Sequence, residues 1–258
     1  MKFNTILFSA FHKAFIQPKA EWIQPIHVGK AISDDDLGYP GDDTGDNISA
    51  LNPMFCELTM SYWIWKNADR SACNYWGLMH YRRYLAPPTL NDYIRMRKSR
   101  SIQSDELDKY LGEKTKARID KDLQRYDVIM PYRRRLIVDE QNMTMEEQFN
   151  MLHITEHWIA TLQVIREKFP DYEQSFHLFQ KDKRMYYANM MITSWTIWNN
   201  YLSWLFEILF EVNTRITIPE DSYQKRVFGF LSERLLNLYI YHNQLTIKRY
   251  ITLNIESY

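Results

Sequence analysis

The sequence predicts a single α/β domain with a mostly parallel central sheet flanked by helices and a helical C-terminal part. Two observations support this: short uncharged runs of strand-forming residues alternate with longer amphipathic stretches, and neither a repeat nor a linker divides the 258 residues. A chain of this length can bury a full core. With 32 basic and 32 acidic residues, it lacks the basic excess that is typical of general nucleic-acid-binding proteins.

Strands and helices are expected from composition and spacing. Apolar runs rich in β-branched and aromatic residues predict strands at 3–10, 22–28, 75–79, 126–131 and, as a shorter segment, 189–192. Apolar residues at helical spacing predict helices that begin at Asn52-Pro53, within 91–125, and over 143–168, 195–209 and 229–243.

Cysteine usage and hydropathy indicate a cytoplasmic protein. Cys56 and Cys73 are too few for a disulfide framework and lack metal-ligand spacing, which fits a reducing compartment. The apolar run at 6–11 is too short for a signal peptide. No run approaches the roughly 18 apolar residues of a transmembrane helix.

An aspartate-rich loop lies between Gly29 and Asn47. It holds six aspartates and four of the seven glycines of the chain. Asp42, Asp43 and Asp46 are close enough in sequence to share Mg²⁺, Mn²⁺ or Ca²⁺, because these ions prefer oxygen ligands. The alternative is a solvated surface loop in which Asp and Gly form turns.

Basic residues follow two predicted strands. His12-Lys13 comes after the first strand, and His80-Tyr81-Arg82-Arg83-Tyr84 ends the third. Ligands bind beyond the carboxyl ends of parallel strands, and guanidinium groups bind phosphate oxygens through two hydrogen bonds. The alternative is that these arginines form salt bridges to the aspartate-rich loop.

Two further patterns each have two interpretations. His153 and His157 form an H-x-x-E-H pattern, which on one helix would suit zinc and otherwise is a polar helix face. Glu233 is followed by Arg234, and this pair is either a poised catalytic carboxylate or a surface ion pair.

Several motifs in order resemble one bacterial family. They read DDTGDNIS at 42–49, CELT at 56–59, GLMHYRRY at 77–84, YDVIMP at 126–131 and GFLSERL at 229–235. The family was long described as a domain of unknown function. It is found in capsular and exopolysaccharide gene clusters, and some members are described as galactofuranosyltransferases.

The resemblance implies a GT-A-like glycosyltransferase over 1–258. Residues 1–135 would form the nucleotide-sugar-binding part and 136–258 the mostly helical acceptor side. The implied reaction moves a sugar, galactofuranose in some members, from a UDP-sugar or related donor to a glycan in capsular polysaccharide, exopolysaccharide or O-antigen synthesis. A lipid-linked acceptor would place the enzyme at the inner face of the cell membrane, as a peripheral protein.

The resemblance also implies roles for particular residues. The donor would be bound by His12, Lys13, Asp43, Asp46, Asn47, His80, Arg82, Arg83 and Asn189. No Asp-x-Asp follows the third strand, so either Asp42, Asp43 and Asp46 hold Mn²⁺ or Mg²⁺, or arginine replaces the cation. For an inverting transfer, Glu233 is the first candidate for the general base and Asp221 the second. The alternative function is a non-catalytic module that binds a glycan or a phospholigand.

Overall fold

The first three strands form the parallel part of the sheet. The computed structural model describes residues 4–256. β1 (Thr5–Phe11) is buried along its whole length and pairs in parallel with β2 (Ile23–His27) and β3 (Tyr75–His80). These pairings confirm the strands predicted at 3–10 (residue 3 lies outside the described residues), 22–28 and 75–79. Because β1 and β3 run in the same direction, the residues that follow them meet at one edge of the sheet.

The rest of the sheet contains antiparallel pairs. β3 turns at Tyr81-Arg82 into the antiparallel β4 (Arg83–Ala86). The C-terminal strand β12 (Ile247–Glu256) is antiparallel to β4 and parallel to β5 (Ser99–Gln103) and β6 (Val128–Pro131). The short β11 (Ile192–Ser194) is antiparallel to both β6 and β3.

The sheet is therefore mixed and partly closed. Its order, β11-β6-β12-β4-β3-β1-β2, returns to β3 through β11. The α/β class is confirmed, but the prediction of a mostly parallel sheet is wrong, because the tight β3–β4 turn and the reversed β11 introduce antiparallel neighbours. The strand expected at 189–192 is found at Ile192–Ser194, because Ala188 and Asn189 have positive φ angles of 71° and 48°.

Helices predicted as continuous are interrupted in two places. The helix that starts at Asn52 is divided into α1 (Asn52–Phe55) and α2 (Leu58–Asn67) at Cys56, whose φ is 52°. The long helix predicted over 143–168 is divided into α6 (Met145–Leu152) and α7 (Thr155–Lys168). Thr144 and Glu147 form a capping box at the start of α6.

The remaining helices complete the domain. α9 (Trp195–Arg215) and α10 (Val227–His242) correspond to the helices predicted at 195–209 and 229–243. The other elements are α3 (Leu90–Ile94), α4 (Leu107–Tyr110), α5 (Glu113–Asp122), α8 (Glu173–Phe179), the 3₁₀ helices η1 (Lys30–Ile32), η2 (Ser49–Leu51), η3 (Ser104–Glu106), η4 (Pro170–Tyr172) and η5 (Gln224–Arg226), and two small ribbons, β7 (Arg134–Arg135) with β10 (Arg184–Met185) and β8 (Ile137–Val138) with β9 (Gln141–Asn142). No helix between residues 4 and 256 combines the length and apolar character needed to cross a membrane.

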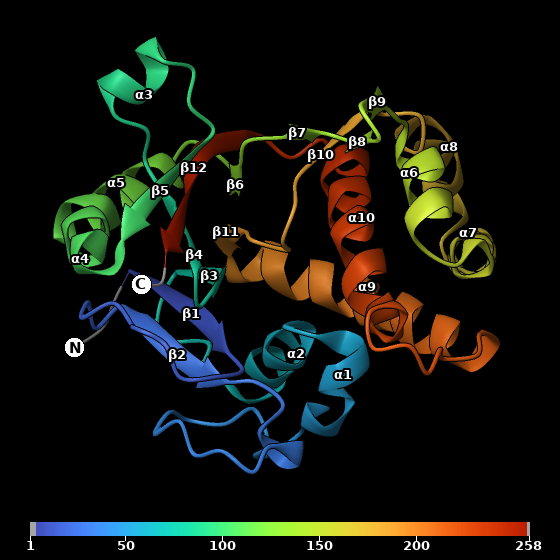
Figure 1. Cartoon of the computed structure of the whole chain (residues 1–258), viewed down its shortest axis with the longest axis horizontal. Coiled ribbons are helices and arrows are strands. Elements are labelled where there is room, and N and C mark those ends of the chain that lie inside the picture. The colour runs from blue at the N-terminus through green and yellow to red at the C-terminus, as the bar shows by residue number, and fades with distance from the viewer. Residues whose placement is uncertain (1–3, 257–258) are drawn as a thin grey trace.

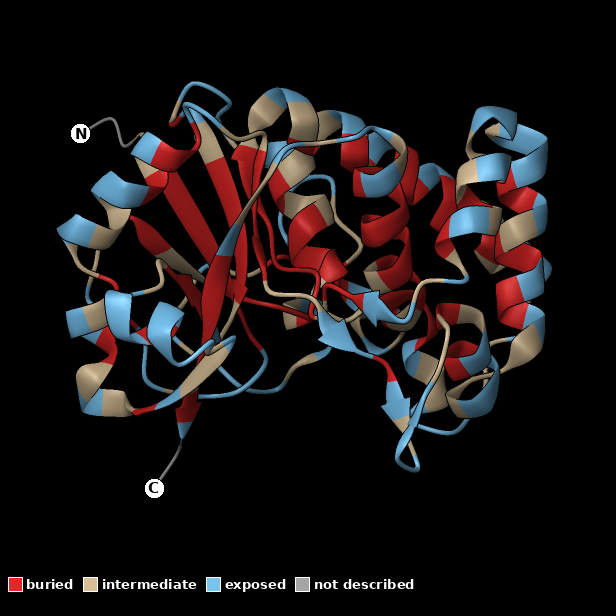
Figure 2. Ribbon diagram, turned by 90° about the horizontal axis from the view of Figure 1, so that it is seen from above, coloured by how far each residue is buried: buried red, intermediate tan, exposed pale blue. Residues whose placement is uncertain are grey.

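The core consists of two apolar layers, one on each face of the sheet. Along β1, Ile6 and Phe8 pack into the layer that contains α9 and α10, whereas Leu7 packs into the layer that contains α4 and α5. This alternation follows from the pleat of a strand. Figure 1 shows α9 and α10 beside the sheet, and Figure 2 shows buried residues along the sheet and along the helices next to it. This packing on both faces holds in place the edge of the sheet where β1 and β3 end.

The close packing of β3 against its neighbours gives a first prediction. A Cβ added at Gly77 would lie 2.2 Å from Leu7 Cδ2 and 3.1 Å from Ile192 Cγ1. Gly77→Ala should therefore lower the free energy of unfolding by about 1–3 kcal/mol, as overpacked cores do. Urea denaturation measures this loss. Gly112→Ala, where the nearest atom is 3.4 Å away, is the control and should change stability by less than about 1 kcal/mol; equal effects would contradict the packing argument.

Candidate functional site

A cavity of about 590 Å³ lies at the edge where β1 and β3 end. We call it the larger cavity. Its basic lining comes from three regions: the end of β1, the β3–β4 turn and the segment before α10, namely His12, His80, Arg82, Arg83, Lys225 and Arg226. Glu57 and Glu233 are the carboxylates among the described lining residues. The cavity thus carries an excess of positive charge.

The Tyr81 ring contacts several basic side chains near the ends of β1 and β3. The Tyr81 ring meets the His12 ring edge-on at a centroid distance of 4.9 Å, and the Arg82 guanidinium lies 5.2 Å from its centroid. Lys13 Nζ lies 5.9 Å from the same centroid. Burial, together with Lys13, Arg82, Arg226 and His80, lowers the pKa of His12. Because it is partly buried and lies next to these cations, His12 favours its neutral form.

A second cavity, of about 320 Å³, shares its wall with the first. We call it the smaller cavity. It is lined by Arg83, Arg134 and Arg135 and by the rings of Tyr132 and Tyr187. Three residues line both cavities: Arg83, Ala188 and Glu233. Glu233 therefore lies where a group in one cavity would meet a group in the other.

The Glu233 carboxylate is held in place and partly desolvated. Ala188 N–H donates to Oε1 at 2.6 Å, and Arg234 Nη1 lies 3.5 Å from Oε2. The side chain is 20% exposed. Burial raises the pKa of Glu233, although Arg234 and the Ala188 N–H act in the opposite direction. A raised pKa makes this carboxylate a stronger base than a solvated glutamate.

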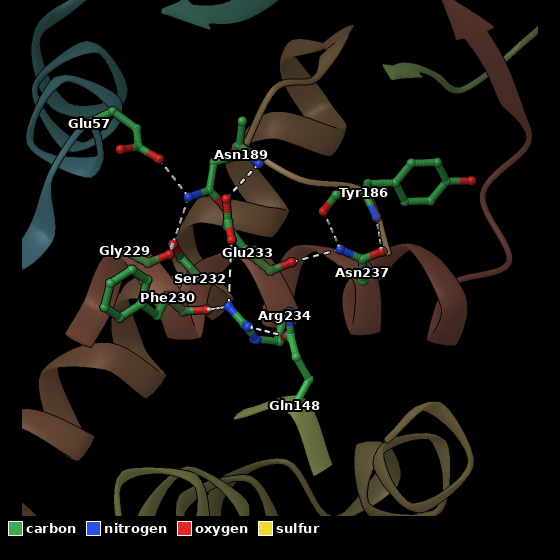
Figure 3. A network of polar contacts seen from close by, with 11 residues as sticks. Glu57, Gln148, Tyr186, Asn189, Gly229, Phe230, Ser232, Glu233, Arg234 and Asn237 are labelled. Atoms are coloured by element: carbon green, nitrogen blue, oxygen red, sulfur yellow. Dashed lines mark hydrogen bonds and ion pairs between the residues drawn. The ribbon is translucent and has the colours of Figure 1, made fainter. Parts of the chain in front are cut away.

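The turn at Ala188-Asn189 links three of the sequence motifs, as Figure 3 shows for Asn189 and its partners. Asn189 Nδ2 donates to Glu57 Oε1 at 2.7 Å and to Ser232 Oγ at 2.8 Å. His80 Nε2 lies 2.6 Å from the Ala188 carbonyl oxygen. Both turn residues have positive φ angles, an energetically costly conformation that persists only where its surroundings enforce it.

The GFLSERL motif holds α10 against this turn. A Cβ at Gly229 would lie 3.0 Å from Cys56 Sγ, so the glycine permits close contact between α10 and the break after α1. Arg234 is 3% exposed and donates to Phe230 O at 2.8 Å and to Gln148 Oε1 at 2.7 Å. The pair Glu233–Arg234 is therefore not a surface ion pair, and Arg234 connects α10 to α6.

Only part of the predicted donor site lines a cavity. His12, His80, Arg82 and Arg83 do so. Lys13, Asp43, Asp46, Asn47 and Asn189 are absent from the described lining of both cavities. Asn189 is 5% exposed, and its amide positions Glu57 and Ser232. Sequence reasoning missed Glu57, Lys225, Arg226, Arg134 and Arg135, although Glu57 and Arg226 lie within or beside quoted motifs.

Aspartates of the aspartate-rich loop accept hydrogen bonds from the loop backbone and from neighbouring segments. Asp42 is fully buried and accepts hydrogen bonds from Gly29 N (3.1 Å), Lys30 N (3.2 Å) and Ser49 Oγ. Asp46 accepts from Tyr62 Oη at 3.1 Å. Among residues 4–256, no three His, Cys, Asp or Glu side chains are grouped to hold a metal ion. The Asp42 carboxylate is thus engaged by backbone N–H groups and by Ser49, and a role for Asp42, Asp43 and Asp46 in holding Mn²⁺ or Mg²⁺ stays a prediction.

Two other predicted sites are not assembled. Asp221 is exposed, and its Oδ1 accepts hydrogen bonds from Tyr223 N and Gln224 N at 3.1 and 2.8 Å, which holds the turn before η5. Asp221 is not among the residues that line either cavity. His153 follows the end of α6, whereas His157 belongs to α7. The zinc interpretation required one continuous helix and is wrong. His153 instead stacks on Phe230 at 4.1 Å, and its burial lowers its pKa to about 4.

Comparison with known proteins identifies relatives. A family model described as "Domain of unknown function (DUF4422)" matches residues 6–244. No curated protein matches the chain. The solved apo structure of the WbbM bifunctional glycosyltransferase is similar, with a TM-score of 0.85 and 29% sequence identity. The match covers 98% of this chain and 46% of that one, so the chain spans about half the length of this relative.

The raised pKa of Glu233 predicts a pH-dependent effect of its replacement. The folded state binds the Glu233 proton more tightly than the unfolded chain does, so this group's contribution to stability falls as pH rises from the ordinary value of 4.5 through the folded pKa. Glu233→Gln removes this loss. The free energy of unfolding of the Glu233→Gln variant, compared with that of the original chain, should therefore be more favourable at about pH 7.5 than at about pH 4.

Thermal unfolding across this pH range provides the measurement. The matched control is Glu220→Gln. Glu220 is an exposed carboxylate that is not among the residues lining either cavity. A stability difference for Glu233→Gln that does not change with pH would show that the folded protein does not shift this pKa upward.

Proposed function

This chain belongs to the family described as "Domain of unknown function (DUF4422)", and we propose that it is a glycosyltransferase with a GT-A-like fold. It moves a sugar from a nucleoside-diphosphate donor to a glycan acceptor. The observation that carries this proposal is that two cationic cavities meet at one carboxylate, Glu233. The similarity to the WbbM bifunctional glycosyltransferase over 98% of the chain supports it.

The larger cavity suits the donor. It lies beyond the carboxyl ends of the parallel β1 and β3, the usual ligand position in such sheets. Arg82, Lys225 and Arg226 form no ion pair with a carboxylate in the described part of the chain, although each lines this cavity. Their charges are available to a diphosphate, and they would stabilise the negative charge that develops on it as it departs. UDP-sugars are the donor class we propose.

The smaller cavity suits the acceptor. Tyr132 and Tyr187 offer rings on which a sugar can stack, and Thr252 and Asn254 offer hydrogen-bonding groups for hydroxyls. Arg83 lies between the two cavities and can contact groups in either. An acceptor bound there would present its hydroxyl to Glu233, which lines the same cavity.

The reaction we propose is a single displacement. Glu233 takes the proton of the acceptor hydroxyl as the acceptor oxygen forms a bond to the anomeric carbon of the donor. The bond from that carbon to the diphosphate oxygen breaks, and the diphosphate leaves with the electron pair. The anomeric centre is inverted. Galactofuranose is the proposed sugar, and capsular polysaccharide, exopolysaccharide or O-antigen the proposed product.

The donor assignment predicts cation-dependent nucleotide binding. Arg82→Ala/Arg226→Ala should weaken UDP binding by at least about tenfold, because each hydrogen bond between charged groups contributes about 1.5–3 kcal/mol. Isothermal titration calorimetry measures the affinity. Arg166→Ala, which removes an exposed arginine that pairs with Glu173, is the control and should bind UDP like the original chain. Unchanged UDP affinity in the double variant would show that the donor diphosphate does not bind at these two arginines.

The base assignment separates catalysis from simple binding. Glu233→Gln should lower the transfer rate by about 10²–10⁴-fold, the usual contribution of a general base, and leave UDP affinity nearly unchanged. Product formation from a panel of UDP-sugars measures the rate, and Asp221→Asn should retain it. Binding without turnover by the original chain, across that panel and its acceptors, would favour a non-catalytic glycan- or phospholigand-binding module.

A further inference from the structure

The segment that joins β4 to β5 carries an exposed apolar surface. We call residues 87–98 the α3 protrusion. In Figure 1, α3 stands out from the body of the molecule beyond β5 and β12. Met96, Leu90 and Ile94 are 85%, 76% and 72% exposed, the highest values for large hydrophobic side chains among residues 4–256. Tyr93 adds a further ring that is 52% exposed. An apolar cluster of this kind usually marks an interaction site.

The exposure is imposed by the local structure. Thr89 and Asp92 form a capping box that fixes the start of α3. Asp92 is 1% exposed and accepts a hydrogen bond from Arg100 Nη2 at 2.5 Å, so this side of α3 is held against the body. Met96 has a φ of 47°, a costly backbone conformation. The outward side of α3 is therefore the apolar one.

Cationic side chains surround the apolar ones. Arg95 and Lys98 are exposed and Arg97 is half-buried. The acidic residue of the protrusion, Asp92, is buried and paired with Arg100, so it does not offset these charges. A surface that combines exposed Leu, Ile, Met and Tyr with Arg and Lys matches the boundary of an anionic bilayer, where apolar groups enter the acyl region and cations bind lipid phosphates.

We propose that the α3 protrusion docks this chain on an anionic lipid bilayer. Charge favours this occupant over a second copy of the chain, because two such protrusions would bring Arg95 and Lys98 against like charges. The protrusion inserts apolar side chains from one short helix, and Arg95, Arg97 and Lys98 contact the headgroups. This docking does not depend on the proposed function.

The position of the protrusion bears on the acceptor. Lys98 Nζ lies 3.5 Å from the carbonyl oxygen of Arg133. Tyr132 and Arg134, on either side of Arg133, line the smaller cavity. Docking therefore brings the smaller cavity close to the bilayer. On the proposed function, this cavity would receive an acceptor glycan that is attached to a lipid.

Vesicle co-sedimentation of the full chain tests the docking. The chain should bind vesicles made of equal parts phosphatidylglycerol and phosphatidylcholine, and bind pure phosphatidylcholine more weakly. Leu90→Ser/Ile94→Ser/Met96→Ser should lower partitioning by at least about tenfold. Met151→Ser/Ile159→Ser/Leu178→Ser, which replaces side chains that are 53%, 49% and 53% exposed elsewhere, should bind like the original chain. Arg95→Glu/Lys98→Glu should remove the preference for anionic vesicles.

Three outcomes would overturn the proposal. They are no binding of the original chain to anionic vesicles, an equal loss in both triple-serine variants, and a concentration-dependent dimer that only the α3 variant loses while its vesicle binding persists. The last outcome would assign the surface to a second copy. Far-ultraviolet circular dichroism of each variant shows that the fold is retained, so a failure of the glycosyltransferase proposal would leave the vesicle result unaffected.

Discussion

The arrangement of the site depends on one hydrogen bond, from the Ala188 N–H to the Glu233 carboxylate. A partly desolvated carboxylate needs such a partner. To supply it, the chain before β11 adopts a left-handed turn at Ala188-Asn189. The same turn contacts His80 through its carbonyl and Glu57 through the Asn189 amide. Four segments far apart in sequence therefore meet around one acid group.

Charge separation within a neutral chain gives the site its character. Many arginines of this protein have carboxylate partners, among them Arg100, Arg118, Arg133, Arg166 and Arg215. The arginines that line the cavities have no such partner among the described residues. Asp42 of the aspartate-rich loop accepts hydrogen bonds from the backbone of Gly29 and Lys30 instead. The balance of 32 basic and 32 acidic residues conceals this local excess. Anionic ligands are what such cavities favour.

Local signals predicted the elements whose own residues carry a clear apolar pattern. The apolar run of β1 and the amphipathic pattern of α9 are visible in the sequence, and both elements form as expected. β12 was missed because its pairing partners, β4, β5 and β6, all lie more than a hundred residues earlier. The break at Cys56 was missed for a similar reason: its backbone conformation accompanies close contact with Gly229 on α10.

By itself, the sequence singled out Glu233, His80, Arg82 and Arg83 as candidates because they belong to motifs, and the structure brings them together in the lining of one cavity. Only the tertiary structure decided the roles of the others. It assigned Asp42 to a loop, Asp221 to a local turn and Asn189 to a buried contact, and it added Glu57, Arg134, Arg135 and Arg226 to the cavity linings. The physical reason is that a polar side chain acts on whatever lies within about 3 Å of it, and here those partners come from distant parts of the chain.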